Sequence, residues 1–488
     1  MSETVFFYIK IQKTHIERDI KEKTKMLKTL SKEEFERRCA GGRRTPVYRE
    51  YIADRETPVS VLTRIIDEPK DLFLLESVYN GERKGRYSYL GIDPVDTPDE
   101  RPFTAAPELP SFQGGRVGYF AYESVSDFEP RVPRRHEEGT PSKLFMTVDS
   151  FVVFDSVRDT AIVAKVAAND TPDAYERTMR EIEELRDRLL SAESIARYVE
   201  GRGKSAAPTL SAFEPEMTKE EFCDIVGRCK EAIRAGEVIQ IVPSQKFTAR
   251  TDIPPLALYR ALRLVNPSPY NFFLRVGSKT LIGSSPEELV RLEKGIGSIA
   301  PIAGTRPRGA TPEMDRALEA ELLADPKERA EHMMLVDLAR NDLGRVAKTG
   351  TVAVRDLAHI ERYSHVMHIV SNVYGELDPD KADAQGLFKA AFPAGTLTGA
   401  PKIRAMELLA EYEKSPRGVY GGAAGYFSYT GDMDFAIVIR TMVLENGTLT
   451  MRAGAGIVAD SDPAKEYQET INKSKAIFQA AEFAKELA

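Results

Sequence analysis

Residues 325–345 of the chain read DPKERAEHMMLVDLARNDLGR, and apolar residues recur in them with the period of a helix. This pattern predicts one helix across the stretch. Glu328 and Glu331 would lie one turn apart on a single face of that helix, where two carboxylates can hold a hard cation. Because such pairs are common on solvent-exposed helices, this pair alone indicates only a surface helix.

A second pair of glutamates with the same spacing occurs near the end of the sequence. Residues 464–476 read AKEYQETINKSKA, which places Glu466 and Glu469 one turn apart on a second predicted helix, with Lys473 one turn further. Mg²⁺ usually takes one or two protein carboxylates and leaves its other positions to water and an anionic substrate. If the two helices meet, their glutamates are expected to form a magnesium site.

Composition and charge narrow the class of protein. The chain has 488 residues, 42% of them hydrophobic, so it can bury a large core. Its formal net charge is -7 and it has no long basic run, which argues against a nucleic-acid-binding surface. The apolar run near the N-terminus is interrupted by Lys10 and Lys13, unlike a secretory signal or a membrane span. Three cysteines, an odd number without metal-ligand spacing, fit a reducing cytoplasm.

Changes in pattern along the chain suggest its organisation. Residues 1–40 form a charged N-terminal extension, 41–200 a β-rich half with strand-like runs such as DLFLLES, 201–215 a linker rich in small residues and proline, and 216–488 the remaining domain. In the last of these, Thr218 and Glu221 form a capping box that predicts a helix over 217–235, ended by Gly236. Strands grouped apart from helices predict an α+β fold with a large β-rich core, helices around it and the active site between helices and sheets.

Three glycine-containing segments have the character of binding loops. Residues 301–309, PIAGTRPRG, hold two glycines and two prolines and predict a tight, irregular loop with exposed amides. Residues 395–407, GTLTGAPKIRAME, predict a loop that enters a helix, where free amides and the helix dipole favour an anion. Residues 452–458, RAGAGIV, predict a third loop. None has the spacing of a phosphate-binding P-loop.

Taken in order, these segments resemble the chorismate-utilising enzyme family, and within it the synthase subunits of anthranilate synthases. The resemblance covers about residues 213–483 and extends to LLES at 74–77 and GGRVGYFAYE at 114–123. Its further motifs are GEVIQIVPSQKF (236–247), NPSPYNFFL (266–274), GSSPEELV (283–290), ERYSHVMHIVS (361–371), YGGAAGYF (420–427) and IVIRTM (437–442).

The resemblance implies a role for each matching residue. Glu331 and Glu469 would be the Mg²⁺ ligands, with Glu328 and Glu466 beside them. The groups that hold chorismate would be Gly304, Thr305, Tyr420, Arg440, Gly454, Ala455, Gly456 and Lys473. The catalytic positions would be His368, Glu287, Gln240 and Thr396, with Glu287 as the acid for departure of the C4 hydroxyl, which requires a raised pKa.

Two positions narrow the reaction that the resemblance implies. Gln240 occupies the position at which isochorismate-forming members of the family carry a lysine that activates water. Ala303 occupies the position at which aminodeoxychorismate synthases carry a lysine that acts as a nucleophile. The expected reaction is amination of chorismate by ammonia at C2, followed by elimination of pyruvate to give anthranilate, the first committed step of tryptophan biosynthesis. The alternatives are a relative that releases aminodeoxyisochorismate, a tryptophan-binding regulatory or scaffold protein without turnover, and a generic metal-binding protein.

The resemblance also implies a partner and an inhibitor. None of Cys39, Cys223 and Cys229 lies in the glycine-rich turn of an amidotransferase nucleophile, so a separate glutamine amidotransferase subunit is expected to supply ammonia, in a heterotetramer. Tryptophan would bind between the two halves of the chain, where Asn271 replaces the usual methionine. The residues expected to line that pocket are Ser77, Pro269, Tyr270 and Asn271.

Overall fold

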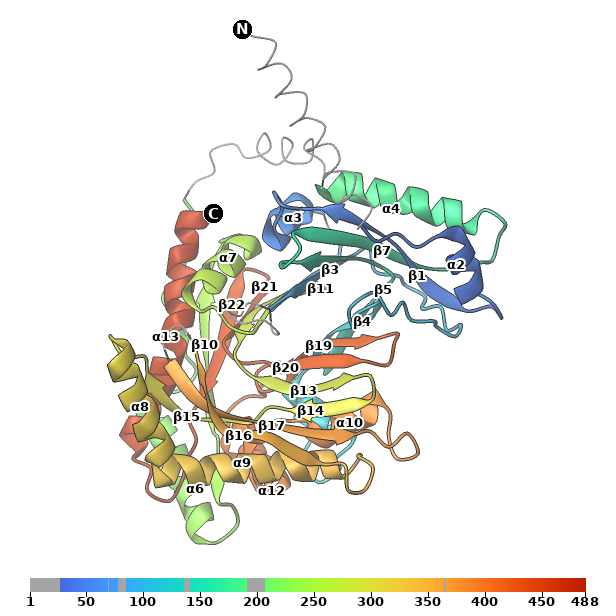
Figure 1. Ribbon diagram of the computed structural model, residues 1–488. Helices are drawn as coiled ribbons and strands as arrows, with labels where there is room; N and C mark the ends of the chain where they lie inside the picture. Colours follow the sequence, from blue (N-terminus) through green and yellow to red (C-terminus); the bar gives the residue numbers. More distant parts are fainter. Residues whose placement is uncertain (1–26, 69, 78–84, 136–140, 191–206, 364–365) are drawn as a thin grey trace, which may run out of the picture.

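Two large antiparallel sheets form the centre of the molecule, and helices lie on the outside (Figure 1). The computed structural model describes residues 27–68, 70–77, 85–135, 141–190, 207–363 and 366–488. Within these ranges, every pair of neighbouring strands in the two sheets runs antiparallel. The β-rich core with surrounding helices confirms the predicted α+β fold.

The larger sheet has eleven strands in the described part of the chain. In order across the sheet they are β1 (Arg44–Ile52), β7 (Thr160–Ala168), β6 (Ser150–Asp155), β3 (Tyr87–Ile92), β2 (Leu72–Glu76), β11 (Tyr270–Val276), β12 (Lys279–Ser285), β21 (Thr441–Glu445), β22 (Thr448–Gly454), β10 (Ser244–Arg250) and β8 (Glu214–Pro215). Because β2 pairs with β11, with Phe73 opposite Leu274, the sheet joins segments from both sides of the predicted linker.

The smaller sheet has nine strands among the described residues. They are β15 (Ile302–Pro307), β17 (Val366–Glu376), β14 (Ile296–Ile299), β13 (Glu288–Glu293), β20 (Met433–Ile437), β19 (Ala423–Ser428), β4 (Gly115–Phe120) and β5 (Lys143–Val148) in order, with β16 (Ala353–Arg362) also paired to β17. β4 pairs with β19, so this sheet is shared between the two halves as well. A separate short ladder joins β9 (Gln240–Ile241) to β18 (Gly399–Ala400).

The helices cover the outer faces of the sheets. They are α2 (Lys32–Arg38), α3 (Pro58–Ile65), the 3-10 helix η1 (Tyr122–Asp127), α4 (Ala174–Leu190), α6 (Lys219–Arg234), α7 (Pro255–Val265), α8 (Pro312–Ala324), α9 (Pro326–Gly344), α10 (Ala384–Ala391), α11 (Gly395–Thr398), α12 (Lys402–Tyr412) and α13 (Pro463–Leu487). Figure 1 shows α4 over β1 and β7, and α13 beside α7. No helix in the described ranges is both long and apolar enough to cross a membrane.

Aromatic side chains hold the two sheets together. Tyr89 of the larger sheet and Tyr426 of the smaller sheet lie with their ring centroids 6.0 Å apart in an edge-to-face arrangement. Phe112 lies against both rings, 5.4 Å from Tyr89 and 5.1 Å from Tyr426. Edge-to-face contacts of this kind add stabilisation beyond the burial of apolar area, so this cluster fixes the distance between the sheets.

The helix starts predicted from the sequence are present. Asp325 caps α9 by accepting hydrogen bonds from the backbone N–H groups of Lys327 and Glu328, and Pro326 occupies the first turn. Thr218 and Glu221 form the reciprocal capping box that begins α6. These local signals are strong because each satisfies backbone N–H groups that have no partner inside the helix.

The prediction of an irregular loop at 301–309 is wrong in its first part. Residues 302–307 form strand β15, which pairs with β17 and has an irregular register between Ala303 and Thr305. Gly304 lies at this irregularity with φ +65°, a conformation that favours glycine. The glycine and prolines therefore mark a bulged edge strand.

The described part of the predicted N-terminal extension is packed into the fold. Leu30 and Phe35 are buried in the main hydrophobic core, and the Leu30 N–H donates to the Tyr48 carbonyl at 3.2 Å. Residues 1–26, and the first part of the linker at 201–206, lie outside the described residues. The division of the chain at 41–200 and 216–488 stays a prediction, since both sheets contain strands from each half.

Candidate active site

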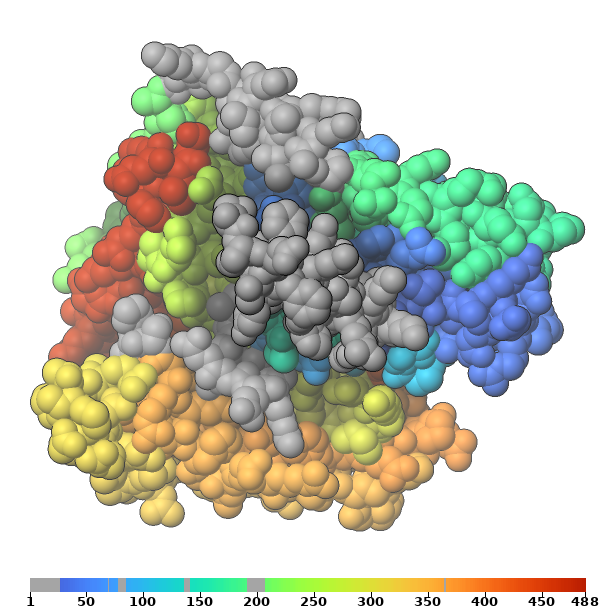
Figure 2. Space-filling model, turned by 45° about the horizontal axis from the view of Figure 1, so that its top comes forward, coloured from blue at the N-terminus to red at the C-terminus, as the bar shows by residue number. Residues whose placement is uncertain are grey.

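A cleft of about 690 Å³ gathers residues from helices α9 and α13 and from the strands beside them. Figure 2 shows these segments together on one face, with α8 and α9 in yellow beneath α13 in red. Fifteen of the sixteen predicted catalytic, substrate-binding and metal-binding residues line it: Gln240, Glu287, Gly304, Thr305, Glu328, Glu331, His368, Thr396, Tyr420, Arg440, Gly454, Gly456, Glu466, Glu469 and Lys473. The two glutamate helices therefore face a common cleft.

All four glutamates have side-chain partners within or beside the cleft. Glu328 accepts from Nη1 of Arg306 at 3.2 Å, and Glu331 lies 3.5 Å from Nε2 of Gln240. On α13, Glu469 pairs with Lys473 at 2.7 Å. No group of three or more His, Cys, Asp or Glu side chains that could hold a metal occurs among the described residues.

Glu466, on α13, has a raised pKa. Burial raises the pKa of the Glu466 carboxyl, and the charge of Glu469 raises it further. A hydrogen bond with Ser461 and the charges of Lys473 and Lys327 oppose this. A cation between the helices would relieve the repulsion between the two carboxylates of α13.

Glu287 is placed to hold a proton at neutral pH. It lies between β12 and β13, and one carboxyl oxygen accepts a hydrogen bond from the Thr396 hydroxyl at 2.9 Å. Burial raises the pKa of Glu287 to about 7, against the lowering effects of the Thr396 bond and of the charges of Arg440 and Lys473. A carboxyl group with this pKa can act as a general acid.

His368 lies on β17 opposite the bulge of β15. Its Nδ1 is 2.9 Å from the Gly304 carbonyl oxygen and 3.1 Å from the Thr305 hydroxyl. A carbonyl oxygen can only accept, so Nδ1 carries the proton and donates it, which leaves the Nε2 lone pair free to accept another. Burial lowers the pKa of His368, so the ring is neutral at pH 7. His365, in the same motif, lies outside the described residues.

Glycines allow the backbone to approach the polar wall of the cleft closely. A Cβ atom on Gly454 would lie 2.9 Å from the Tyr420 hydroxyl, and one on Gly456 would lie 3.0 Å from Nε2 of Gln240. Lys473 donates to the Gly454 carbonyl at 3.1 Å. Arg440 has a left-handed backbone (φ +49°), and its Nη1 lies 3.4 Å from Oδ1 of Asn266. The two cations and the Tyr420 hydroxyl can together receive a carboxylate-bearing ligand.

Ala455 is the one predicted substrate-binding residue that the structure does not place in the cleft. It is fully buried, and its N–H donates to the Pro243 carbonyl at 3.1 Å. The amide is therefore already paired. Ala455 follows directly after the end of β22 at Gly454, and its role in holding chorismate stays a prediction.

The comparisons with known proteins agree with this geometry. Residues 76–479 match the model of the chorismate binding enzyme family. The chain belongs to this family. It is 44% identical to anthranilate synthase component 1 of Pseudomonas aeruginosa, over 94% of this chain and 99% of that one.

Solved structures show the same fold. The crystal structure of anthranilate synthase component I from Streptococcus pneumoniae is 36% identical, with a TM-score of 0.70, over 82% of this chain and 94% of that chain. The menaquinone-specific isochorismate synthase of Escherichia coli, 20% identical with a TM-score of 0.68, covers 92% of this chain and 98% of that one, and shows the fold alone.

Two arginines in or beside the cleft were not predicted from the sequence motifs. Arg306 bonds Glu321, Asp325 and Glu328, so it ties β15 to the start of α9. Arg452 lines the cleft and pairs with Glu216 at 2.9 Å. Both lie inside the glycine-containing segments 301–309 and 452–458, where the basic side chain beside the glycines was the available signal.

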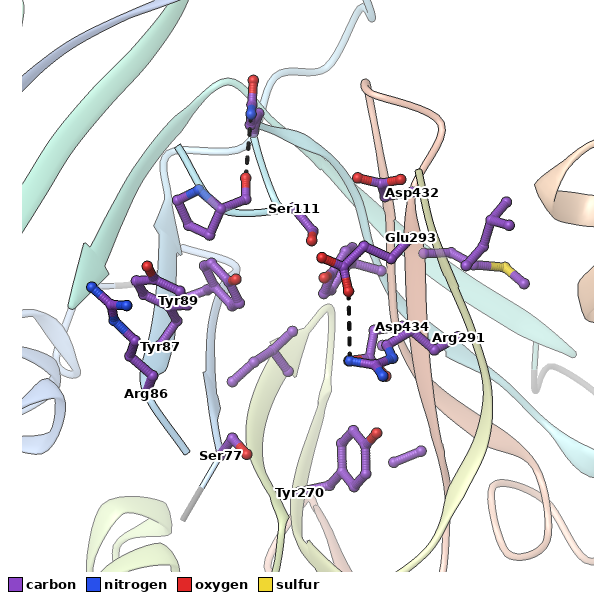
Figure 3. A pocket seen from close by; sticks show the side chains of 18 of the residues that line it. Ser77, Arg86, Tyr87, Tyr89, Ser111, Tyr270, Arg291, Glu293, Asp432 and Asp434 are labelled. Carbon is purple, nitrogen blue, oxygen red and sulfur yellow. Dashed lines mark hydrogen bonds and ion pairs between the residues drawn. The ribbon is translucent and has the colours of Figure 1, made fainter. Parts of the chain in front are cut away.

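A second cavity, of about 650 Å³, lies between the two sheets (Figure 3). All four residues predicted for an inhibitor pocket line it: Ser77, Pro269, Tyr270 and Asn271. Figure 3 shows Tyr89 of the larger sheet and Glu293 of the smaller sheet at the same cavity. The Tyr270 hydroxyl donates to Glu288 at 2.9 Å. Oδ1 of Asn271 is buried, with no hydrogen-bond partner in the described part of the chain.

Proposed function

We propose that this chain is the synthase subunit of an anthranilate synthase, which converts chorismate and ammonia to anthranilate and pyruvate. The observation that carries the proposal is that one cleft holds a buried carboxyl group with a raised pKa, Glu287, and a histidine with a lowered pKa, His368, between two glutamate-bearing helices. The similarity to anthranilate synthase component 1 along 94% of the chain supports it.

The side chains of the cleft suggest how the reaction proceeds. Arg440 and Lys473 bind the carboxylates of chorismate. Ammonia attacks C2 as the ring double bonds shift, and Glu287 gives its proton to the C4 hydroxyl, which leaves as water. Nε2 of His368 then accepts the C2 proton, and the bond between C3 and the ether oxygen breaks as the ring becomes aromatic. The side chain leaves as an enolate, which takes up a proton at its methylene carbon to give pyruvate.

Magnesium is proposed as the cofactor because the four glutamates of the cleft offer carboxylate oxygens as ligands. Carboxylate oxygens are ligands that Mg²⁺ prefers, and it commonly takes only one or two of them from the protein. Glu331 and Glu469 would hold it, with Glu328 and Glu466 beside them. Absence of a three-residue ligand cluster from the described residues fits this sparse mode. Bound there, the ion would neutralise a carboxylate of chorismate and orient the ring.

Two residues favour amination over the other reactions of the family. Gln240 and Ala303 both line the cleft, and neither side chain can act as a base or as an amine nucleophile. Product analysis tests the proposal. Chorismate, Mg²⁺ and ammonium should yield anthranilate and pyruvate in equal amounts by chromatography. Aminodeoxyisochorismate without pyruvate would favour the aminating alternative, and isochorismate would contradict the proposal.

The expected ammonia source gives a separate prediction. The purified chain should form anthranilate with ammonium and none with glutamine. The reason is that its three thiols do not suit nucleophilic catalysis: Cys39 and Cys229 are buried, and burial raises the pKa of the Cys223 thiol. Adding a glutamine amidotransferase subunit should restore glutamine use. Efficient glutamine use by the chain alone would contradict the proposed amidotransferase subunit and the heterotetramer that it would form. We propose the cytoplasm as the location of that heterotetramer.

We also propose that the cavity between the sheets binds tryptophan as a feedback inhibitor. Replacing Ser77 by phenylalanine should raise the tryptophan concentration for half-inhibition by about 5- to 150-fold, since overfilling a packed site costs about 1–3 kcal/mol. Activity without tryptophan should be retained because Ser77 does not line the catalytic cleft. Ser278→Phe, in a hairpin outside the cavity, is the control. Unchanged inhibition in S77F would place the inhibitor elsewhere.

A further inference from the structure

Arg417 lies behind the wall of the catalytic cleft and makes an unusually complete set of contacts. Its side chain is 1% exposed. Its Nε and Nη2 donate to the two carboxylate oxygens of Glu413 at 2.9 and 2.7 Å. Glu413 is itself buried and also accepts from the backbone and hydroxyl of Ser244, both at 2.8 Å. This bidentate pair gives the guanidinium group one fixed orientation.

The remaining donors of Arg417 reach two separate segments of the cleft wall. Nη1 donates to the Leu397 carbonyl at 2.7 Å, and Nη2 to the Val242 carbonyl at 2.6 Å. Leu397 and Val242 both line the cleft, whereas Arg417 does not. The guanidinium group also lies 5.8 Å from the ring centroid of Tyr420, a third wall residue. The Arg417 side chain therefore contacts three segments of the cleft wall: α11 at Leu397, the segment just after β9 at Val242, and the 420–427 motif at Tyr420.

Each of these contacts adjoins a residue with a proposed role. Leu397 follows Thr396, whose hydroxyl donates to Glu287. Val242 is two residues from Gln240, and its N–H donates to the Thr398 carbonyl at 3.0 Å, which ties the same two segments together. Since α11 is only a single turn, Gly395–Thr398, its own hydrogen bonds do little to fix it. Its placement therefore depends on neighbouring segments, through the bond from Arg417 to the Leu397 carbonyl and the pairing of Val242 with Thr398.

We propose that Arg417, oriented by Glu413, is a positioning residue that holds Thr396 against the Glu287 carboxyl group. The inference rests on the proposed function, in which Glu287 is the acid. Arg417 lies outside the sequence motifs described above. It does not line the cleft itself and acts through residues that do. Loss of the fixed fork should let α11 move away from Glu287 while the fold persists.

The test uses the pH dependence of kcat. The Thr396 bond lowers the pKa of Glu287, so its loss raises that pKa and moves the alkaline fall in kcat to higher pH. The charges of Arg440 and Lys473 also act on Glu287. Glu288 and Asp342 line a cavity of about 40 Å³ with it, and Asp342 pairs with Lys402 at 2.9 Å. None of these is changed in the variants.

Four variants separate positioning from simple destabilisation. Thr396→Val removes the hydroxyl directly, and Arg417→Lys keeps the charge but loses the fork. In both variants the alkaline fall in kcat should move to higher pH, and Arg417→Lys should also lower kcat about 10-fold or more. In the double variant the fall should move no further than in the single variant with the larger shift. Arg64→Lys is the control: the Arg64 side chain is buried, and its Nη2 donates to both carboxylate oxygens of Glu56 at 2.7 Å, away from the cleft. Arg64→Lys should lower the melting temperature of the chain without changing the pH at which kcat falls.

Defined outcomes overturn the inference. If Arg417→Lys melts at a lower temperature but keeps the kcat and pH limb of the unsubstituted chain, Arg417 is structural only. Additive shifts in the double variant would show that Arg417 and Thr396 act independently. If Arg417→Lys does not fold, Glu413→Gln, which loosens the fork from the other side, should show the same limb shift. Lack of anthranilate formation by the unsubstituted chain would instead count against the proposed function.

Discussion

Replacing Glu287 by glutamine is expected to lower kcat for anthranilate formation by about 10²–10⁴-fold. The amide keeps the shape and can still accept the Thr396 hydrogen bond, but it cannot give a proton to the leaving hydroxyl. Chorismate binding should change little, because the cations that meet its carboxylates are retained. The measurement is steady-state kinetics with ammonium as the nitrogen source.

The same residue sets an expected pH dependence in the unsubstituted chain. Glu287 is needed in its protonated form and burial raises its pKa to about 7, so kcat should be full well below pH 7 and fall to about half as the pH rises to about 7. Glu376→Gln, on β17 and outside the cleft, is the control and should keep this profile. Turnover of E287Q within a factor of two of the unsubstituted chain would remove Glu287 from the acid role.

Replacing His368 by alanine is the second change with a large expected effect, again about 10²–10⁴-fold in kcat. The ring is neutral, Nδ1 donates to the Gly304 carbonyl, and only Nε2 can take a proton. Aminodeoxyisochorismate should accumulate, since the alanine variant retains Glu287 for the amination step. Chromatography of the products with time would detect it.

His359 provides the matched control for this substitution. It lies on β16, the strand next to β17, and its Nδ1 contacts the Asp356 carbonyl at 2.8 Å, but it does not line the cleft. His359→Ala should therefore retain turnover. Unchanged anthranilate formation in H368A would disqualify His368 from the elimination step.

Features carried by local sequence were predictable. The helices with the E-x-x-E pairs begin at capping residues next to the predicted positions, because capping and helical periodicity act over a few residues. The edge strand β15 was missed because its glycine and prolines hide the two-residue period of a strand. Those residues fit there only because β17 supplies the pairing, which a local pattern does not show.

Features that depend on tertiary contacts were not predictable from motifs alone. The raised pKa of Glu287 arises from its burial by segments distant in the sequence, and the sequence could state only that it was required. The buried amide of Ala455 is paired with Pro243, more than 200 residues earlier. Arg417 has no motif signal for its role, because its partners Leu397 and Val242 are backbone carbonyls, which any sequence supplies.

The most direct measurement of the central claim is anthranilate fluorescence from the purified chain with chorismate and ammonium, recorded with Mg²⁺ and again after chelation. The account predicts a steady increase with Mg²⁺, loss of the signal with chelator and its recovery when Mg²⁺ is restored. Glu331→Gln should lose the signal at Mg²⁺ concentrations that saturate the unsubstituted chain. No fluorescence at high ammonium and Mg²⁺, or an equal rate in the presence of chelator, would contradict the account.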